Sequence, residues 1–409
     1  MMRIIGKRFF LRILLSLAVV GFTCSLILLP NCPAGAQQTN QQRPRRVTNG
    51  NDASGTPPPK KGDEVDEGDV VRVETQLVAV PAIVTGHDGR LLPGLRKENF
   101  AVYEDGQLQT LANFGMTDAP FEIGLLLDTS GSTREDVSLI REAANAFIEA
   151  LRPGDHVAIE AFNTAEDGPN KMAAVQVLSE LTSDRKELRN AIDNLGSSNG
   201  TPFYDALERM AVDIFRLPPR DEVRGRRAVV ALTDGVDSSS NSDFAQAKAK
   251  LMSAGVATYF IQVNTEDFVE DRLMKDCQDD GRLSLSQKQL ERYRKIFVPA
   301  ANKEDYVNFC QMGPFERMSI SRELYNLARR EMNDLAKGTG GKNFLAATLQ
   351  DARTAFSRVA EDIGTQYSLG YYPTNKARDG KFRTIKVDVK GIKDKPVVRA
   401  REGYYAPKQ

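Results

Sequence analysis

The chain has 409 residues, in which 55 lysines and arginines balance 55 aspartates and glutamates. This balance lacks the basic excess that attracts a phosphate backbone, so the composition argues against a nucleic-acid partner. The length allows more than one domain.

Residues 1–36 have the features of a secretory signal peptide, with four basic residues ahead of an apolar run at 13–29. Ala34 and Ala36 then form a cleavage site of the small-x-small type. Cleavage would make the protein secreted or periplasmic, and removing four of the 55 basic residues would leave a net charge near −4. The alternative is an uncleaved N-terminal membrane anchor, although the run is near the lower length limit for spanning a bilayer.

Residues 37–69 are rich in Gln, Asn, Pro, Arg and Lys and have almost no large apolar side chains. A segment of this composition cannot bury enough apolar surface to fold, so we predict a disordered linker. We expect it to act as a spacer ahead of the folded part of the chain.

Residues 70–120 have the pattern of short β-strands, separated by turn signals at 87–89 and 104–106. About fifty residues are few for an independent sandwich. Residues 365–409 show the same alternation of apolar and polar positions. We therefore expect both segments to form one small β-sandwich, with the residues between them inserted as a second domain.

Residues 121–364 alternate predicted strands with predicted helices. This alternation predicts a Rossmann-like α/β fold, in which helices cover both faces of a mostly parallel sheet. The expected strands are 123–127, 157–162, 172–178, 227–232, 256–263 and 342–345, and the expected helices are 133–151, 184–195, 244–252, 323–337 and 349–363.

Oxygen-bearing side chains follow two of these strands and precede one helix. The first strand runs into Asp128, Ser130 and Ser132, a later strand ends at Asp234, and Thr201 precedes a helix. The carboxyl ends of parallel strands meet at one edge of the sheet, where α/β folds bind ligands. Carboxylates and hydroxyls are hard ligands that suit Mg²⁺ or Mn²⁺. The alternative is that these residues only form turns and helix caps.

These motifs resemble the metal-ion-dependent adhesion site of the von Willebrand factor A domain, which combines an Asp-x-Ser-x-Ser loop with a threonine and an aspartate from two other loops. The resemblance implies a Rossmann-like fold and a metal site of Asp128, Ser130, Ser132, Thr201 and Asp234. It also implies that Mg²⁺ or Mn²⁺ keeps one position open for an acidic group of a partner protein. A protein ligand that presents Asp or Glu is therefore the expected partner.

The flanking segments at 94–106, 367–373 and 401–405 are similar to those of secreted proteins related to this domain that are abundant in Acidobacteria. That resemblance covers nearly the whole mature chain. It implies no known biochemical activity, because the family is defined by sequence more than by function.

Residues 264–316 depart from the family pattern, which has a short loop at this point. Leu290, Tyr293 and Phe297 have helical spacing, so we predict an amphipathic helix in the middle of this insertion. In the family's sheet order the insertion begins two strands from Asp128, about 10 Å from the metal. It could shape the binding face, or it could be a peripheral decoration that faces away.

Cys277 and Cys310 both lie inside the insertion and are the only cysteines beyond residue 36. In an oxidising compartment we expect them to form a disulfide, worth about 3–4 kcal/mol on the loop-entropy model. The alternative is a reduced pair.

The sequence offers no placed catalytic base. His87 lies in a turn signal, and His156 opens a strand whose carboxyl end, not its amino end, is directed to the predicted site. The glycine-rich stretch at 338–342 follows a helix and precedes a strand, the reverse of a phosphate loop.

We therefore predict no enzymatic activity and favour a metal-dependent protein-binding module of the adhesion type. The alternative is a structural envelope protein whose metal only stabilises the fold. A hydrolytic enzyme is a third and weaker hypothesis.

Overall fold

The computed structural model describes residues 77–115, 119–130, 137–164, 173–223, 225–274, 285–393 and 395–408. The chain divides at residue 70, and all of these residues belong to the C-terminal unit. The predicted signal peptide or membrane anchor and the predicted linker lie outside them. None of the helices in these ranges is long and apolar enough to cross a bilayer.

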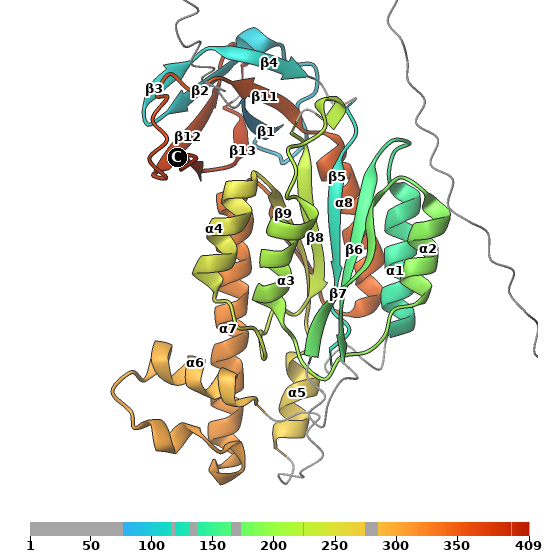
Figure 1. Ribbon diagram of the computed structural model, residues 1–409, viewed down its shortest axis with the longest axis vertical. Helices are drawn as coiled ribbons and strands as arrows, with labels where there is room; N and C mark the ends of the chain where they lie inside the picture. The colour runs from blue at the N-terminus through green and yellow to red at the C-terminus, as the bar shows by residue number, and fades with distance from the viewer. Residues whose placement is uncertain are drawn as a thin grey trace, which may run out of the picture. The chain divides into compact units, whose positions relative to one another are not determined.

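A six-stranded sheet forms the centre of residues 122–346, with the strand order β10-β9-β8-β5-β6-β7 (Figure 1). The pairs β10-β9, β9-β8, β8-β5 and β5-β6 are parallel, and only β7 runs antiparallel to its neighbour. The mostly parallel sheet was predicted and is confirmed. The strands are β5 (Glu122–Leu127), β6 (His156–Thr164), β7 (Ala173–Thr182), β8 (Arg227–Thr233), β9 (Ala257–Val263) and β10 (Lys342–Ala346).

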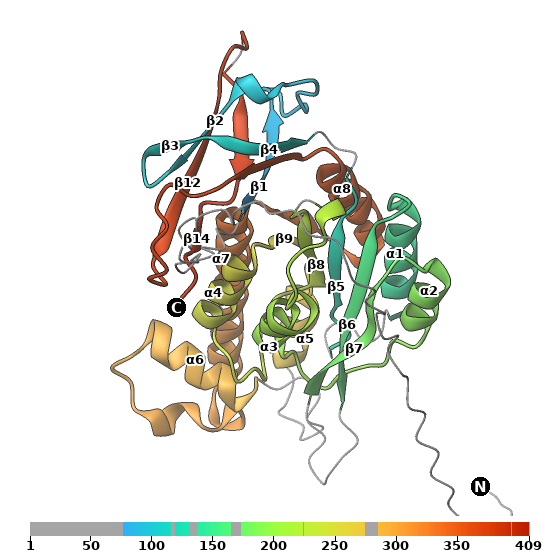
Figure 2. The ribbon, with the colours of Figure 1, turned by 45° about the horizontal axis from the view of Figure 1, so that its top comes forward.

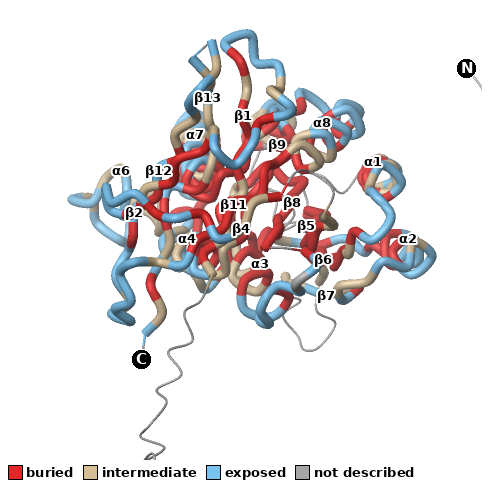
Figure 3. The backbone as a smooth tube through the Cα atoms, turned by 90° about the horizontal axis from the view of Figure 1, so that it is seen from above, coloured by how far each residue is buried: buried red, intermediate tan, exposed pale blue. Residues whose placement is uncertain are grey.

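Helices cover both faces of this sheet because its central strands are apolar on both sides. Every residue of β5, β8 and β9 is buried, as the red tube segments in Figure 3 show. One face packs against α1 (Val137–Ala150), α2 (Arg185–Asp193) and α8 (Ala352–Gly364). The other packs against α3 (Phe203–Arg209), α4 (Phe244–Ala254) and α7 (Pro314–Thr339). A π-helical turn at Met210–Ile214 continues α3.

Two four-stranded antiparallel sheets, β13-β1-β11-β4 and β14-β12-β2-β3, form the β-sandwich (Figure 2). Each sheet combines strands from both ends of the folded chain, so the shared sandwich is confirmed. Val80, Val102 and Leu369 belong to its core, where the hydroxyls of Tyr371 and Tyr404 donate to the buried carboxylate of Glu104. The strands are β1 (Val78–Thr85), β2 (Phe100–Glu104), β3 (Gln107–Gln109), β4 (Leu111–Gly115), β11 (Tyr367–Tyr371), β12 (Phe382–Val389), β13 (Val397–Ala400) and β14 (Gly403–Tyr405).

The insertion contains α5 (Glu266–Leu273), α6 (Gln287–Phe297) and two 3₁₀ turns, Lys303–Tyr306 and Phe309–Gln311. The amphipathic helix expected around Leu290 is confirmed as α6. Helix α7 begins at Pro314, nine residues before the expected start at Glu323, because proline suits the first helical position. Its added first turns supply Ile320 to a small core that the insertion builds with Leu273, Leu285, Leu290 and Phe309.

Candidate metal centre

Two buried aspartates follow neighbouring parallel strands at the carboxyl edge of the sheet. Asp128 follows β5 and Asp234 follows β8, and Leu127 lies opposite Leu232 in the ladder. Asp128 is 0% exposed and Asp234 is 3% exposed. The strand register therefore sets the two carboxylates side by side at one edge.

Local hydrogen bonds fix the orientation of the Asp128 carboxylate. Its Oδ2 accepts from the Thr233 hydroxyl at 2.6 Å, and its Oδ1 accepts from the backbone N–H of Ser130 at 2.9 Å. Burial and the nearby negative charge of Asp234 together raise the pKa of Asp128 to about 7, although the hydrogen bonds from Ser130 and Thr233 lower it. A cation at this edge would therefore relieve an unfavourable pair of buried negative charges.

Asp234 is bound from two other elements. Its Oδ2 accepts from the hydroxyl of Thr265 at 2.7 Å and from that of Tyr325 at 3.5 Å, and its Oδ1 accepts from the N–H of Val236 at 3.0 Å. Thr265 lies just before α5 in the insertion, and Tyr325 belongs to α7. Thr265, the second residue of the insertion, therefore forms a hydrogen bond with a residue of the predicted site.

The loop that carries Thr201 is held between the loops that follow β5 and β8. The N–H of Ser198 donates to the carbonyl of Thr129 at 2.8 Å. Thr201 donates its N–H to the Ser238 hydroxyl at 2.8 Å and accepts from the N–H of Ser238 at 3.0 Å. Thr201, which is 6% exposed, is thereby fixed near both aspartate loops.

Asp237 has a supporting role that sequence reasoning missed. Its carboxylate accepts from the N–H groups of Phe203 at 2.9 Å and Tyr204 at 3.3 Å, and so caps α3 from another loop. Burial raises the pKa of Asp237 to about 6. Pro202 is the N-cap residue, and α3 begins at Phe203. The cap comes from 34 residues away, so no local pattern announces it.

The available donors favour a hard divalent cation. Within the described ranges, no three His, Cys, Asp or Glu side chains form a metal-binding group. A cation at this edge would therefore depend on hydroxyl oxygens as well as on Asp128 and Asp234, and Ser130 and Thr201 supply that kind of donor. Ser132 lies outside the described residues, so its place in the metal site stays a prediction. Cys277 also lies outside them, so the disulfide between Cys277 and Cys310 stays a prediction.

Helix α6 of the insertion binds the loop that supports Thr201. The Ser286 hydroxyl donates to the Ser238 carbonyl at 2.6 Å. Lys288 Nζ donates to the carbonyls of Ser239 and Ser240 at 2.7 and 2.9 Å, and to Asn241 Oδ1 at 3.0 Å. Figure 1 shows α5 and α6 beyond the carboxyl end of β9, the strand that leads into α5. The insertion is therefore in contact with the candidate site.

Arg292 gives α6 a second anchor. Its guanidinium binds Glu331 of α7 at 2.7 Å and lies 4.6 Å from the ring centroid of Tyr204, whose hydroxyl also donates to Glu331. All three side chains are largely buried, which makes this ion pair less screened by solvent than a surface pair. The contact connects the insertion to α3 and α7 together.

Both histidines lie away from this edge. His156 is opposite Glu122 at the amino end of the strands, where its Nε2 is 2.8 Å from Arg220. His87 is exposed in the turn after β1. In the 338–342 stretch, Gly340 has a φ of 85° and is the C-cap of α7.

The model of the von Willebrand factor type A domain matches residues 122–290. No curated protein matches the chain. Among solved structures, the conserved hypothetical protein BatB from Bacteroides thetaiotaomicron is similar, with 13% identity and a TM-score of 0.35 over 59% of this chain and 98% of that chain. A von Willebrand factor type A protein from Catenulispora acidiphila has 11% identity and a TM-score of 0.38, with coverage of 76% and 74%. Proximal thread matrix protein 1 from the mussel byssus has 14% identity and a TM-score of 0.39, and the match spans 64% of this chain and 50% of that protein.

Proposed function

Residues 122–290 form a von Willebrand factor type A domain, and we propose that the protein is a secreted or periplasmic module that binds an acidic group of a partner protein through a divalent cation. Domains of this family typically bind proteins. The observation that carries the proposal is the meeting of Asp128 and Asp234 at one sheet edge, with Thr201 held against both of their loops.

Asp128, Ser130, Ser132, Thr201 and Asp234 would hold the cation, which we propose to be Mg²⁺ or Mn²⁺. When bound, the cation supplies a coordination position for a further anionic oxygen. Asp128 keeps its orientation through the hydroxyl of Thr233, so little rearrangement is needed on binding.

The coordination capacity of the cation, and not the net charge of the site, would admit an acidic partner. Two carboxylates neutralise a divalent cation, and the serine and threonine hydroxyls add ligands without adding charge. A Glu or Asp side chain on another protein would then complete the shell of oxygen ligands.

The insertion would restrict which acidic groups reach this position. Lys288 and Ser286 bind the carbonyls of residues 238–240, and Ser238 in turn binds Thr201. An element fixed in this way adds contacts with the partner that the cation alone cannot supply, and so increases specificity.

The proposal is tested by capture from a native envelope extract with Mg²⁺ and, in parallel, with chelator. We expect the wild type to retain partner proteins only with Mg²⁺, and Asp128→Ala to retain none. Asp193→Ala, an exposed aspartate on α2, is the matched control and should behave like the wild type. Equal capture with Mg²⁺ and with chelator would overturn the proposal.

A second candidate is a structural envelope protein whose cation only stabilises the fold. The burial of Asp128 and Asp234, at 0% and 3% exposure, favours it, because a cation would offset the repulsion between two buried carboxylates. This candidate predicts that Mg²⁺ raises the melting temperature while no partner is captured. Metal-dependent capture separates the two.

A further inference from the structure

A pocket lies where the β-sandwich meets the C-terminal end of α4, and it has a volume of about 150 Å³. Its wall includes Arg401, Tyr404, Lys376, Arg378 and the backbone of Gly255. Arg227 at the start of β8 also lines it, whereas Asp234 follows the end of the same strand. The pocket is thus about one strand length, roughly 20 Å, from the candidate metal centre.

Arg401 gives this pocket a buried positive charge. Arg401 is 8% exposed, and its guanidinium donates to the carbonyls of Gly403 at 2.9 Å, Met252 at 2.8 Å and Ala79 at 3.4 Å. These acceptors are neutral, and no carboxylate of the described residues forms an ion pair with Arg401. A buried guanidinium without a counter-charge is costly, and it has more N–H donors than these three bonds use.

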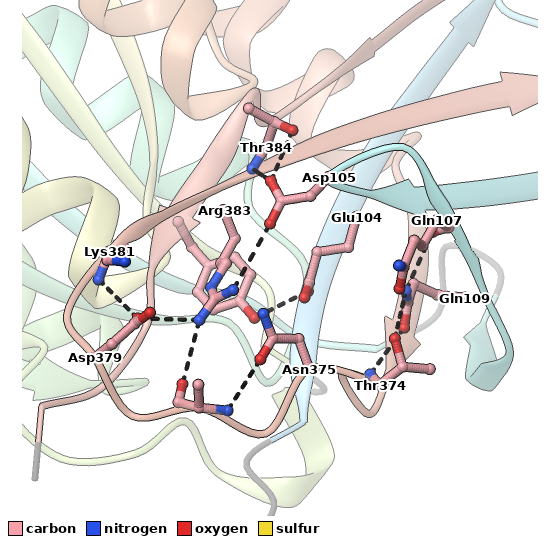
Figure 4. Close-up of polar contacts among 12 residues, drawn as sticks. Glu104, Asp105, Gln107, Gln109, Thr374, Asn375, Asp379, Lys381, Arg383 and Thr384 are labelled. Atoms are coloured by element: carbon pink, nitrogen blue, oxygen red, sulfur yellow. Dashed lines mark hydrogen bonds and ion pairs between the residues drawn. The ribbon is translucent and has the colours of Figure 1, made fainter.

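Two further cations stand on an ordered loop at the rim. Lys376 and Arg378 are exposed and form no ion pair within the described ranges. Their loop is fixed by Arg383, which donates to the Ala377 carbonyl at 3.4 Å and to Asp379 at 3.0 Å (Figure 4). A pair of bonds between Gln109 and Thr374, each of 3.1 Å, holds the other end of the loop.

No described residue that lines the pocket is acidic, so the three charges of Arg401, Lys376 and Arg378 are not compensated there. Arg227 binds the buried carboxylate of Glu122 at 2.7 Å, which it shares with Arg220 at 2.9 Å. The rest of the wall includes Tyr404 and other apolar surface. A cavity of about 150 Å³ accommodates a molecule about the size of benzene.

We propose that this pocket binds a small organic carboxylate, with the carboxylate at Arg401, Lys376 and Arg378 and an apolar body no larger than one six-membered ring against Tyr404. A carboxylate can accept from the remaining guanidinium donors in the plane of the group. The site is independent of the divalent cation and of the acidic protein partner proposed above.

The test is a calorimetric titration of the metal-free full chain with benzoate, repeated with Asp128→Ala so that residual metal at the other edge cannot bind the ligand. Benzamide carries the same ring without the charge, and inorganic phosphate carries charge without the ring. The double variant Lys376→Gln/Arg378→Gln removes the two rim charges at exposed positions, which spares the fold. Lys381→Gln, an exposed lysine of the same loop that does not line the pocket, is the matched control.

We expect saturable benzoate binding at or below about 10 mM, the range for a ligand of this size. The double variant should weaken it about tenfold, since each exposed charge contributes a few-fold at most, and Lys381→Gln should leave it unchanged. Equal affinity for benzamide would show that the charge has no role, and phosphate binding as tight as benzoate binding would show that the cavity has none. Each of these two results would overturn the proposal. The absence of benzoate binding, or an unchanged benzoate affinity in the double variant, would overturn it as well.

Discussion

Glu160 allows a direct test of how a buried ionisable side chain affects the stability of this fold. The side chain lies on β6, is 0% exposed, and neither carboxylate oxygen has a hydrogen-bond partner among the described residues. Burial raises its pKa to about 8; Arg209 opposes this effect, while Asp213 and Glu180 add to it. Glu160 is therefore expected to be protonated and neutral in the folded protein at pH 7.

The sign of the pH effect follows from this raised pKa. The folded state holds the proton up to about pH 8, whereas the unfolded state releases it near the ordinary glutamate pKa of 4.5. The stability that protonated Glu160 contributes is therefore fully present below the pKa of Glu160 in the unfolded state. It is lost as the pH rises through the pKa of Glu160 in the folded state. At 1.36 kcal/mol per pKa unit, the free energy of unfolding falls by about 4 kcal/mol between about pH 5 and about pH 9.

Glu160→Gln should remove this dependence. The amide costs stability by a fixed amount because it is buried without a partner, so the comparison rests on the slope and not on the absolute value. Urea unfolding across the pH range should give a free energy of unfolding that falls more steeply with pH for the wild type than for Glu160→Gln. Glu149→Gln, an exposed glutamate of α1, is the control and should follow the wild type. Parallel curves for the wild type and Glu160→Gln would refute the reasoning.

Three further outcomes can be measured. Deleting residues 366–409 removes β11 to β14 and uncovers the apolar face of β1 around Val80, so light scattering should detect aggregation. Residues 121–364 alone should stay soluble. A well-folded monomer after the deletion would contradict this prediction. Replacing residues 266–314 with a short Gly/Ser loop should leave Mg²⁺ binding intact but make partner capture weaker or less selective, and unchanged capture would show that the insertion has no part in recognition. Gly235→Ala should destabilise the fold by about 1–3 kcal/mol by thermal unfolding, because φ is 76° there and the new Cβ would lie 2.5 Å from Met332 Cε; an unchanged melting temperature would contradict this.

Much of the fold follows from local patterns in the sequence. The apolar runs of β5, β8 and β9 have the composition of strands buried on both faces, and the heptad-like spacing of Leu290 and Phe297 marks α6. The β-sandwich was predicted from a size argument, because neither terminal segment alone has enough strands to bury a core.

The details that complete the candidate site come from residues distant in the sequence. Thr265 and Tyr325 reach Asp234 across 31 and 91 positions, and Asp237 caps α3 across 34. A threonine, a tyrosine and an aspartate in these segments have no local pattern that distinguishes them from surface residues. The same holds for Arg401, whose acceptors Met252 and Ala79 lie in two other elements.

Titration calorimetry of the metal-free protein with Mg²⁺, and separately with Mn²⁺, tests the central claim most directly. Asp128→Ala removes one of the two carboxylates at the sheet edge, and we expect the affinity for the cation to fall by at least about tenfold. The fold should survive, because the site lies at the edge of the sheet and outside both hydrophobic cores. Asp193→Ala should bind the cation like the wild type. An unchanged metal affinity in a folded Asp128→Ala protein would contradict the account.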